Sequence, residues 1–232
     1  MSDGPSLTVI LPIYNEIEIL EPNLRHIDQF LATHFADYEI LIVESASTDG
    51  TAEACDRLVG DMPHVRVIHE GGRNGIGSAT RLGFMAATKD WAWRYAIDLP
   101  CPLEAILEAQ PLFDGHDCVL SYRSHDDRVA FRKLQSAVFN LVVKQALSIR
   151  VRHVNSAFKV FRTKLIQKFP LQSNTGFVDT EMVFWTFRHR LRWVEIPVAL
   201  TERTGGRSSV TLSDPLHYLG ELVRLVRSGT GE

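Results

Sequence analysis

Hydrophobic and polar positions follow two patterns along the first half of the chain, continuous apolar runs and a helical repeat. Three short apolar runs predict buried strands, and they span Leu7–Pro12, Tyr38–Ser45 and Val65–Glu70. Between the first two runs, apolar residues recur three and four positions apart from Ile17 to Leu31, which predicts an amphipathic helix. Strands that alternate with helices at this spacing indicate βαβ units and a mostly parallel sheet.

The remaining elements follow from the same patterns. Further strands are expected at Trp93–Leu99, Asp117–Arg123, His153–Arg162 and Trp193–Leu200. Further helices are expected at Thr48–Asp61, Asn74–Thr88, Pro102–Phe113, Phe131–Ile149 and Asp179–Arg190. A last helix begins at Ser213, where Asp214 and Pro215 give typical first-turn chemistry.

Composition narrows the class of protein. The chain has 232 residues, of which 45% are hydrophobic, and this suits a single α/β domain with a full core. The three cysteines are irregularly spaced, which predicts neither a disulfide framework nor a CxxC metal site. No secretory signal and no apolar stretch of the roughly 18 residues that cross a bilayer is apparent. A cytoplasmic protein is therefore expected.

Charge is distributed unevenly. Residues 121–169 contain eleven Lys or Arg and two acidic residues, within a chain whose net charge is −3. Such a basic segment indicates a phosphate-bearing partner or an anionic membrane surface, or simply a solvated helix face. Nothing in the pattern indicates nucleic acid. The apolar side of Phe131–Ile149 could lie on a membrane, although packing in the core is the more frequent role of such a face.

Polar side chains stand where the predicted strands end. Asn15 and Glu16 follow the first strand, Glu44 and Ser45 close the second, and Asp98 closes the fourth. In open parallel sheets, ligands bind outside the carboxyl ends of the strands. These five residues therefore define the expected binding edge.

Four motifs in order suggest a family. The segments VILPIYNE, VESASTDGT, NGIGSATRLGF and AIDLPCPLE are followed by NSAFKVFR, TGFVDTEM, VEIPV and ERTGGRSS. Each is weak alone, but the ordered set resembles glycosyltransferase family 2 and its GT-A fold over nearly the whole chain. The branch it resembles most contains the dolichol- and polyprenyl-phosphate sugar transferases.

The resemblance implies a nucleotide-sugar site in the first half. Residues of the first turn would line the nucleoside: Pro12, Tyr14, Asn15 and Glu16. Asn15 or Glu16 could instead only cap the following helix. Glu44 and Ser45 stand where the family usually has two aspartates, and Glu44 could still accept hydrogen bonds from a base. Arg81 could face the donor diphosphate or be a solvated surface residue.

The metal motif of the family is incomplete here. Asp98 aligns with the second aspartate of a D-x-D pair, whereas Ala96 replaces the first and Pro100 replaces a glutamine. Mg²⁺ or Mn²⁺ prefers several hard oxygen ligands, so any metal at Asp98 should bind weakly. Asp98 could otherwise contact the sugar or ribose in a metal-independent enzyme, or the catalytic machinery could have decayed.

The second half would bind the acceptor. The resemblance implies this role for five residues, Arg123, Arg132, Ser136, Arg203 and Ser208. A guanidinium fork suits a phosphate monoester. Asp179 or Glu181 would be the general base for a hydroxyl acceptor, whereas a phosphate acceptor hardly needs one. Asp179 could also simply cap the helix after it.

Together these expectations describe an inverting glycosyltransferase. It would use a nucleotide-diphosphate sugar and a polyprenyl-phosphate-like or other small acceptor, at or near a membrane surface. Residues 1–120 would form the nucleotide-sugar half and residues 121–232 the acceptor half of one GT-A domain. Four altered positions, Glu44, Ser45, Ala96 and His153, leave two alternatives. One is a degenerate protein that binds a nucleotide or partner without catalysis, and the other is a secondary-metabolite enzyme with an unusual donor.

Overall fold

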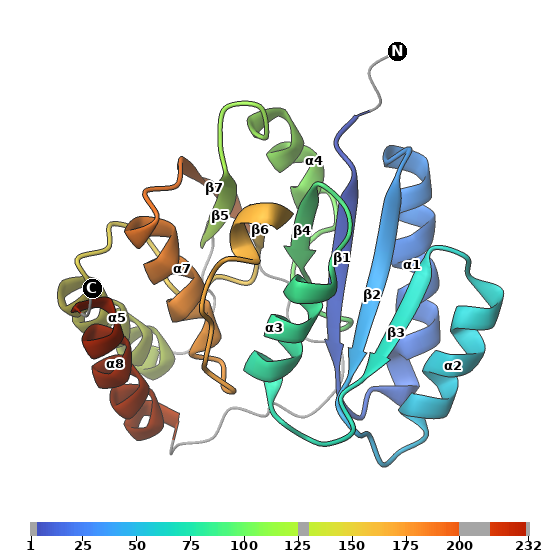
Figure 1. Cartoon of the computed structure of the whole chain (residues 1–232), viewed down its shortest axis with the longest axis horizontal. Coiled ribbons are helices and arrows are strands. Elements are labelled where there is room, and N and C mark those ends of the chain that lie inside the picture. The colour runs from blue at the N-terminus through green and yellow to red at the C-terminus, as the bar shows by residue number, and fades with distance from the viewer. Residues whose placement is uncertain (1–3, 125–129, 200–213, 231–232) are drawn as a thin grey trace.

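A seven-stranded sheet runs through the molecule in the order β3-β2-β1-β4-β6-β5-β7 (Figure 1). The computed structural model describes residues 4–124, 130–199 and 214–230, without the side chains of 130–135, 214–217 and 228–230. The strands are β1 (Leu7–Ile13), β2 (Tyr38–Glu44), β3 (Val65–His69), β4 (Trp91–Arg94), β5 (Cys118–Arg123), β6 (Lys159–Arg162) and β7 (Trp193–Val198). Strand β6 is antiparallel to β4 and β5, and the other pairs are parallel. The predicted α/β class with a mostly parallel sheet is confirmed.

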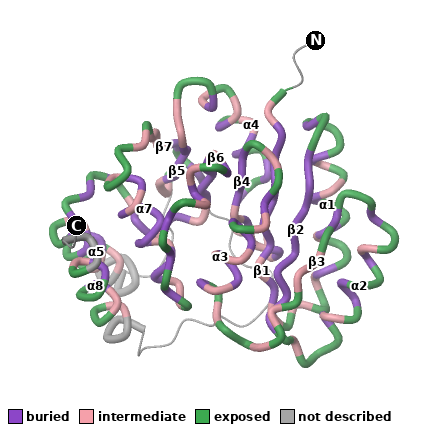
Figure 2. The backbone as a smooth tube through the Cα atoms, viewed as in Figure 1, coloured by how far each residue is buried: buried purple, intermediate pink, exposed green. Residues whose placement is uncertain are grey.

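Helices cover both faces of this sheet. They are α1 (Ile17–His34), α2 (Thr51–Asp61), α3 (Ile76–Ala86), α4 (Ala105–Ala109), α5 (Ala130–Leu147), α6 (Thr163–Ile166), α7 (Val178–Arg188) and α8 (Asp214–Thr230), with a 3-10 turn η1 (Gln110–Leu112). Apolar residues of α1, α2 and α4 pack on one face, and those of α3, α5, α7 and α8 pack on the other. The buried strands β1 and β2 therefore lie between two layers (Figure 2).

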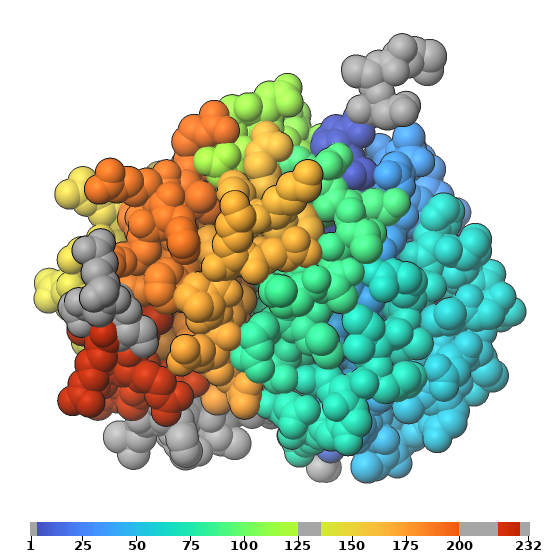
Figure 3. All heavy atoms as spheres, in the orientation of Figure 1, coloured from blue at the N-terminus to red at the C-terminus, as the bar shows by residue number. Residues whose placement is uncertain are grey.

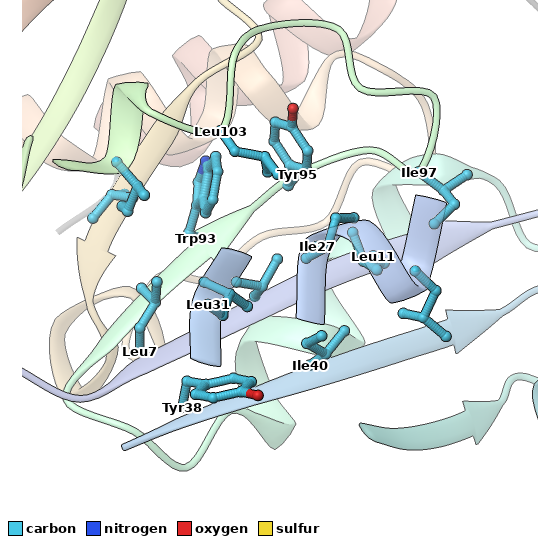
Figure 4. Packing of buried hydrophobic residues seen from close by; sticks show 14 of the residues in the cluster. Leu7, Leu11, Ile27, Leu31, Tyr38, Ile40, Trp93, Tyr95, Ile97 and Leu103 are labelled. Atoms are coloured by element: carbon cyan, nitrogen blue, oxygen red, sulfur yellow. The ribbon is translucent and has the colours of Figure 1, made fainter. Parts of the chain in front are cut away.

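Aromatic residues of β4 anchor the hydrophobic core between the sheet and helices α1, α2 and α4. Trp91 stacks on Phe113 with ring centroids 3.8 Å apart, and Trp93 lies 4.4 Å from Tyr95. Figure 4 shows Trp93 and Tyr95 on one side of the cluster, with Ile27 and Leu31 of α1 nearby. All three cysteines are buried and free.

Two predicted strands are shorter than the sequence suggested. Strand β4 stops at Arg94, opposite Lys159, so Asp98 lies in a turn rather than at a strand end. Residues 153–158 do not join the sheet, and Val154 donates its backbone N–H to the Asn140 side chain (2.8 Å) instead of to a strand.

Helix α5 turns much of its apolar side outward. Val143 and Leu147 join the core, but Val138, Leu141 and Val142 are between 45% and 56% exposed. The interpretation of this apolar side as core is therefore wrong for these three residues.

Helix α3 approaches the sheet closely through a glycine. A Cβ built on Gly83 would lie 2.3 Å from Cγ2 of Ile10 and 3.3 Å from Cγ2 of Val43. Both residues are buried in the sheet, so they have little room to shift. The glycine thus sets the distance between α3 and strands β1 and β2.

We predict that Gly83→Ala destabilises the protein, because the added methyl overpacks this contact at a cost of about 1–3 kcal/mol. Gly60→Ala is the matched control, since Gly60 is also helical and its Cβ would meet nothing within 4 Å. The control should gain up to about 1 kcal/mol from helix propensity. Urea denaturation measures both, and equal stability of the two variants would contradict the prediction.

Candidate functional site

The turns after β1 and β2 lock together at the carboxyl edge of the sheet. The two strands end side by side, with Ile13 opposite Glu44. Asn15 accepts from the backbone N–H of Thr48 (2.8 Å) and donates its own N–H to Ser47 Oγ (3.0 Å). Asn15 and Ala46 both have φ of 55°, a left-handed conformation that non-glycine residues rarely adopt. Such strain persists where neighbours hold it, and it clusters at ligand sites.

Asp49 and Thr51 extend this lock to the first helix. Asp49 accepts from the backbone N–H groups of Ile17 (3.3 Å) and Thr51 (3.0 Å). Thr51 Oγ1 accepts from the backbone N–H of Glu16 (3.0 Å). The second turn thus caps α1, and neither Asn15 nor Glu16 does so by a side-chain bond.

Glu44 is the buried member of a polar chain that reaches the surface. Its side chain is 2% exposed and accepts from the backbone N–H of Ser47 (2.5 Å) and from Nδ1 of His69 (2.9 Å). Nε2 of His69 lies 3.1 Å from Asp56. Burial opposes ionisation of Glu44, but the bonds from His69 and Ser47 outweigh it and hold its pKa below the usual value. The bonds to Glu44 and Asp56 raise the pKa of His69.

Ser45 is tied to Glu70, a residue that the sequence analysis did not single out. The hydroxyl groups of Ser45 (2.5 Å) and Ser78 (2.6 Å) both donate to the Glu70 carboxylate. This carboxylate links the end of β2 to the first turn of α3. Both positions of the altered acidic pair, Glu44 and Ser45, are therefore engaged within the protein.

Arg81 contacts a loop from the second half of the chain. Its guanidinium lies 3.5 Å from the Ser173 carbonyl and 3.3 Å from Oδ1 of Asn174. Gly75 has φ of 92°, and a Cβ there would lie 2.2 Å from the Asn174 carbonyl oxygen. Figure 3 shows this loop, in orange, against α3, in green. The glycines before α3 thus admit the loop, and the structure gives Arg81 a protein contact rather than an open face.

Asp98 sits in a tight turn beyond β4. Leu99, the next residue, has φ of 50°, and its backbone N–H donates to the Ala96 carbonyl (3.1 Å). The Asn23 side chain of α1 holds the Ile97 carbonyl (2.7 Å). Asp98 is half-buried, and these two hydrogen bonds hold the backbone on either side of it.

The protein supplies few ligands for a divalent metal ion around this turn. Ala96 and Pro100 carry no side-chain ligand, and no group of three or more His, Cys, Asp or Glu is placed to hold a metal among the described residues. Mg²⁺ and Mn²⁺ need several hard oxygens, and Asp98 offers one carboxylate.

Asp179 joins two cations from adjacent strands. Its Oδ1 lies 2.8 Å from Nη2 of Arg94 on β4 and 2.9 Å from Nζ of Lys159 on β6. Lys159 is fully buried and also donates to the Ser156 carbonyl (2.5 Å). Burial lowers the pKa of Lys159 to about 8, although Asp179 opposes this shift. Asp179 is in the first turn of α7 and forms no cap.

Glu181 holds the loop that precedes α7. Its buried Oε2 accepts from the backbone N–H groups of Gln172 and Ser173, each at 3.0 Å. Burial raises the pKa of this carboxyl, although the two N–H groups oppose the shift. Glu221 of α8 accepts from the hydroxyls of Ser173 and Thr175, at 2.7 Å each, so the loop is held from two sides.

The expected acceptor residues are only partly described. Arg123 ends β5, and its backbone N–H donates to Nδ1 of His153 (3.1 Å). On α5, the Ser136 carbonyl accepts from the side chain of Asn140 (2.7 Å). The side chain of Arg132, and all of Arg203 and Ser208, lie outside the described residues.

Sequence comparison identifies the family. The family model for glycosyl transferase family 2 matches residues 8–174, which run from the second residue of β1 through β6 and include both interlocked turns. The chain belongs to this family. The prediction made from the ordered motifs is confirmed.

Several curated proteins resemble the chain. Glycosyltransferase AglD of Haloferax volcanii is 29% identical over 205 residues, covering 84% of this chain and 33% of AglD. An undecaprenyl-phosphate 4-deoxy-4-formamido-L-arabinose transferase of Klebsiella pneumoniae is 27% identical, and the match covers 94% of this chain and 66% of that transferase. An undecaprenyl-phosphate mannosyltransferase of Micrococcus luteus is 26% identical, and the match covers 87% of this chain and 86% of the mannosyltransferase. The family 2 chain thus spans only part of the first two relatives.

Solved structures confirm the GT-A fold. Glucosyl-3-phosphoglycerate synthase from Mycobacterium tuberculosis, in complex with Mn²⁺ and uridine-diphosphate-glucose, superposes with a TM-score of 0.70 at 18% identity. That match covers 97% of this chain and 79% of the synthase. The complex with phosphoglyceric acid gives a TM-score of 0.69 at 20% identity, covering 97% and 80%.

We predict that His69 titrates above its ordinary pKa of 6.5, and that Glu44→Gln lowers this pKa because the neutral amide no longer favours the imidazolium. A raised folded pKa contributes stability that is complete below about pH 6.5 and is lost as the pH rises through the folded value. The stability gap between wild type and His69→Gln should therefore shrink at alkaline pH. NMR titration and urea melts measure both effects. An unchanged His69 pKa in Glu44→Gln would refute the coupling.

Proposed function

We propose that this chain transfers a sugar from a nucleoside-diphosphate sugar to a polyprenyl phosphate with inversion. An acceptor phosphate oxygen attacks the anomeric carbon and forms the new C–O bond. The bond from that carbon to the diphosphate breaks on the opposite face, and the nucleoside diphosphate leaves with the electron pair. Membership of family 2 and relatives named for undecaprenyl-phosphate acceptors support this reaction.

One observation favours a phosphate acceptor over a hydroxyl. Asp179, the residue expected to be the base for a hydroxyl, is bonded to both Arg94 and Lys159. A carboxylate held by two cations is a poor proton acceptor. Glu181 is occupied by two backbone N–H groups. A phosphate is already anionic and needs no base, which suits this arrangement.

The proposed roles follow the two halves of the domain. In residues 1–120, Pro12, Tyr14, Asn15 and Glu16 border the nucleoside beside Glu44 and Ser45, while Asp98 orients the sugar or ribose. In residues 121–232, Arg123, Arg132, Ser136, Arg203 and Ser208 bind the acceptor. Arg81 stabilises the loop near the donor.

A membrane surface suits the acceptor end of the molecule. Helices α5 and α8 lie side by side at the end farthest from β3 (Figure 1). The exposed residues of α5 are joined there by Leu219 (53% exposed) and Val223 (46%) of α8. Arg224 and Arg227 of α8 are also exposed and would suit anionic headgroups. No helix among the described residues is long and apolar enough to cross a bilayer.

A nucleotide-binding protein without catalysis is the second candidate. It is favoured by the engagement of Glu44 and Ser45 in internal bonds, since these positions are altered from the family pattern. Turnover separates the two candidates, because both would bind a nucleotide.

We predict glycolipid formation from undecaprenyl phosphate and at least one donor in a panel of uridine-, guanosine-, thymidine- and cytidine-diphosphate sugars. Little dependence on Mn²⁺ is expected, because Ala96 and Pro100 supply no ligands. Asp98→Asn should lower kcat/KM by on the order of 100-fold, as misplacing a reacting group does. Radiolabelled product, with EDTA or Mn²⁺, is the measurement.

Glu104→Gln is the matched control, because this exposed carboxylate caps no helix by its side chain. Its activity should equal that of wild type. Donor binding without turnover across the panel would reject the enzyme in favour of the second candidate. A tight Mn²⁺ requirement that Asp98→Asn abolishes would show that this aspartate holds a metal after all.

We also predict that the wild-type protein floats with vesicles containing phosphatidylglycerol. A Val138→Glu, Leu141→Glu double variant should bind more than about tenfold more weakly, because each buried aliphatic side chain contributes roughly 1.5–3 kcal/mol. Met85→Glu on α3 is the control, since Met85 is 56% exposed but lies on another helix. Equal flotation of both variants would rule out this surface as the contact.

A further inference from the structure

Two cations face each other across neighbouring strands at the carboxyl edge of the sheet. Arg94 of β4 and Lys159 of β6 are direct partners in the antiparallel register. Like charges in such a pair repel each other. Both contact Oδ1 of Asp179, which shows that their side chains lie on the same side of the sheet.

The charges of this cluster do not cancel. Among the described residues, Asp179 is the one carboxylate bonded to Arg94 or Lys159, so two positive charges share one negative charge. Lys159 is fully buried, where an uncompensated charge is costly. The cluster therefore favours an additional anion close to it.

Arg94 is the member of the cluster that can meet such an anion. Its side chain is 14% exposed, whereas that of Lys159 is 0% exposed. Nη2 is bonded to Asp179, and Nε is buried without a hydrogen-bond partner among the described residues. A guanidinium fixed at one nitrogen still has N–H groups directed along its other edge, and this fork matches phosphate oxygens.

The location of the cluster fits a phosphate of the substrate. Arg94 precedes by two residues Ala96, where the family expects a metal-binding aspartate. Ligands of parallel sheets bind at this edge. Arg94 at the end of β4 thus brings a fixed positive charge within two residues of the incomplete metal motif.

We propose that Arg94, held by Asp179 and backed by Lys159, is a phosphate-binding residue that supplies positive charge where the metal motif is incomplete. The inference rests on the proposed transferase function and identifies how that site holds its substrate. The phosphate is either the donor's diphosphate or the acceptor's monoester. Arg94 touches it, and Asp179 and Lys159 are positioning residues.

Calorimetry in EDTA tests this assignment with two base-free probes, inorganic pyrophosphate and farnesyl phosphate. Wild type should bind at least one of them. Arg94→Gln should weaken that binding by at least tenfold, and Arg94→Lys should restore part of it by returning the charge. The probe that loses affinity identifies the source of the phosphate.

Arg192→Gln is the matched control, because Arg192 is 61% exposed and pairs with a single carboxylate, Asp117. It should bind both probes within twofold of wild type. Asp179→Asn should weaken binding of the affected probe, because Asp179 holds Arg94 and makes the buried charge of Lys159 tolerable. Added to Arg94→Gln it should weaken binding no further, whereas a merely structural role of Asp179 would weaken binding in both backgrounds.

Two results overturn the inference. One is that wild type in EDTA binds neither probe, and the other is that folded Arg94→Gln binds both as wild type does. Turnover in the donor panel decides the proposed function separately. Wild-type turnover with unchanged binding by Arg94→Gln removes only the phosphate subsite. Probe binding that depends on Arg94, without turnover, leaves the subsite and removes the transferase.

Discussion

The Asp179 carboxylate holds together the middle of the sheet and the helix above it. Strands β4 and β6 place Arg94 and Lys159 opposite each other, and this pairing is tolerable only because Asp179 of α7 lies within 2.9 Å of both. The contact also joins the two halves of the chain, since β4 belongs to the first half and β6 and α7 belong to the second. The carboxyl edge of the sheet thus combines residues from both halves of the chain through one ionic contact.

The rest of that edge follows from parallel strands that end in register. Because β1 and β2 end side by side, the turns after them must share a small space, and Asn15 bonds to the second turn while Asp49 caps α1. Left-handed conformations at Asn15, Ala46 and Leu99 are the local cost of this arrangement. Glu44 holds the second turn, because its side chain accepts from the backbone N–H of Ser47 (2.5 Å).

Periodicity predicted the fold well and the site less completely. The apolar runs of β1 and β2 and the helical spacing of α1 were sufficient to predict these elements. A strand buried on both faces is apolar throughout, and a helix buried along one stripe repeats its apolar residues every three or four positions. The sequence did not reveal that Lys159 is fully buried, since a lysine in an apolar run looks like a surface residue. His69 and Glu70 were missed for a similar reason, because their importance depends on contacts between distant segments. The sequence left open whether the apolar side of α5 packs in the core or lies on a membrane, because periodicity shows which residues share a face, not what covers it.

The positive charge that a phosphate needs at this site can come from a metal ion or from a side chain. A divalent ion brings two charges but requires several oxygen ligands, and this chain retains only Asp98 in the matching segment. A guanidinium needs no ligands, stays charged at any physiological pH and is aimed by the strand that carries it. Its limit is a single charge, which a buried lysine nearby can reinforce only if a carboxylate makes the burial tolerable. Arg94, Lys159 and Asp179 meet these conditions together, so the loss of metal ligands at Ala96 and Pro100 is compatible with a working phosphate-handling site.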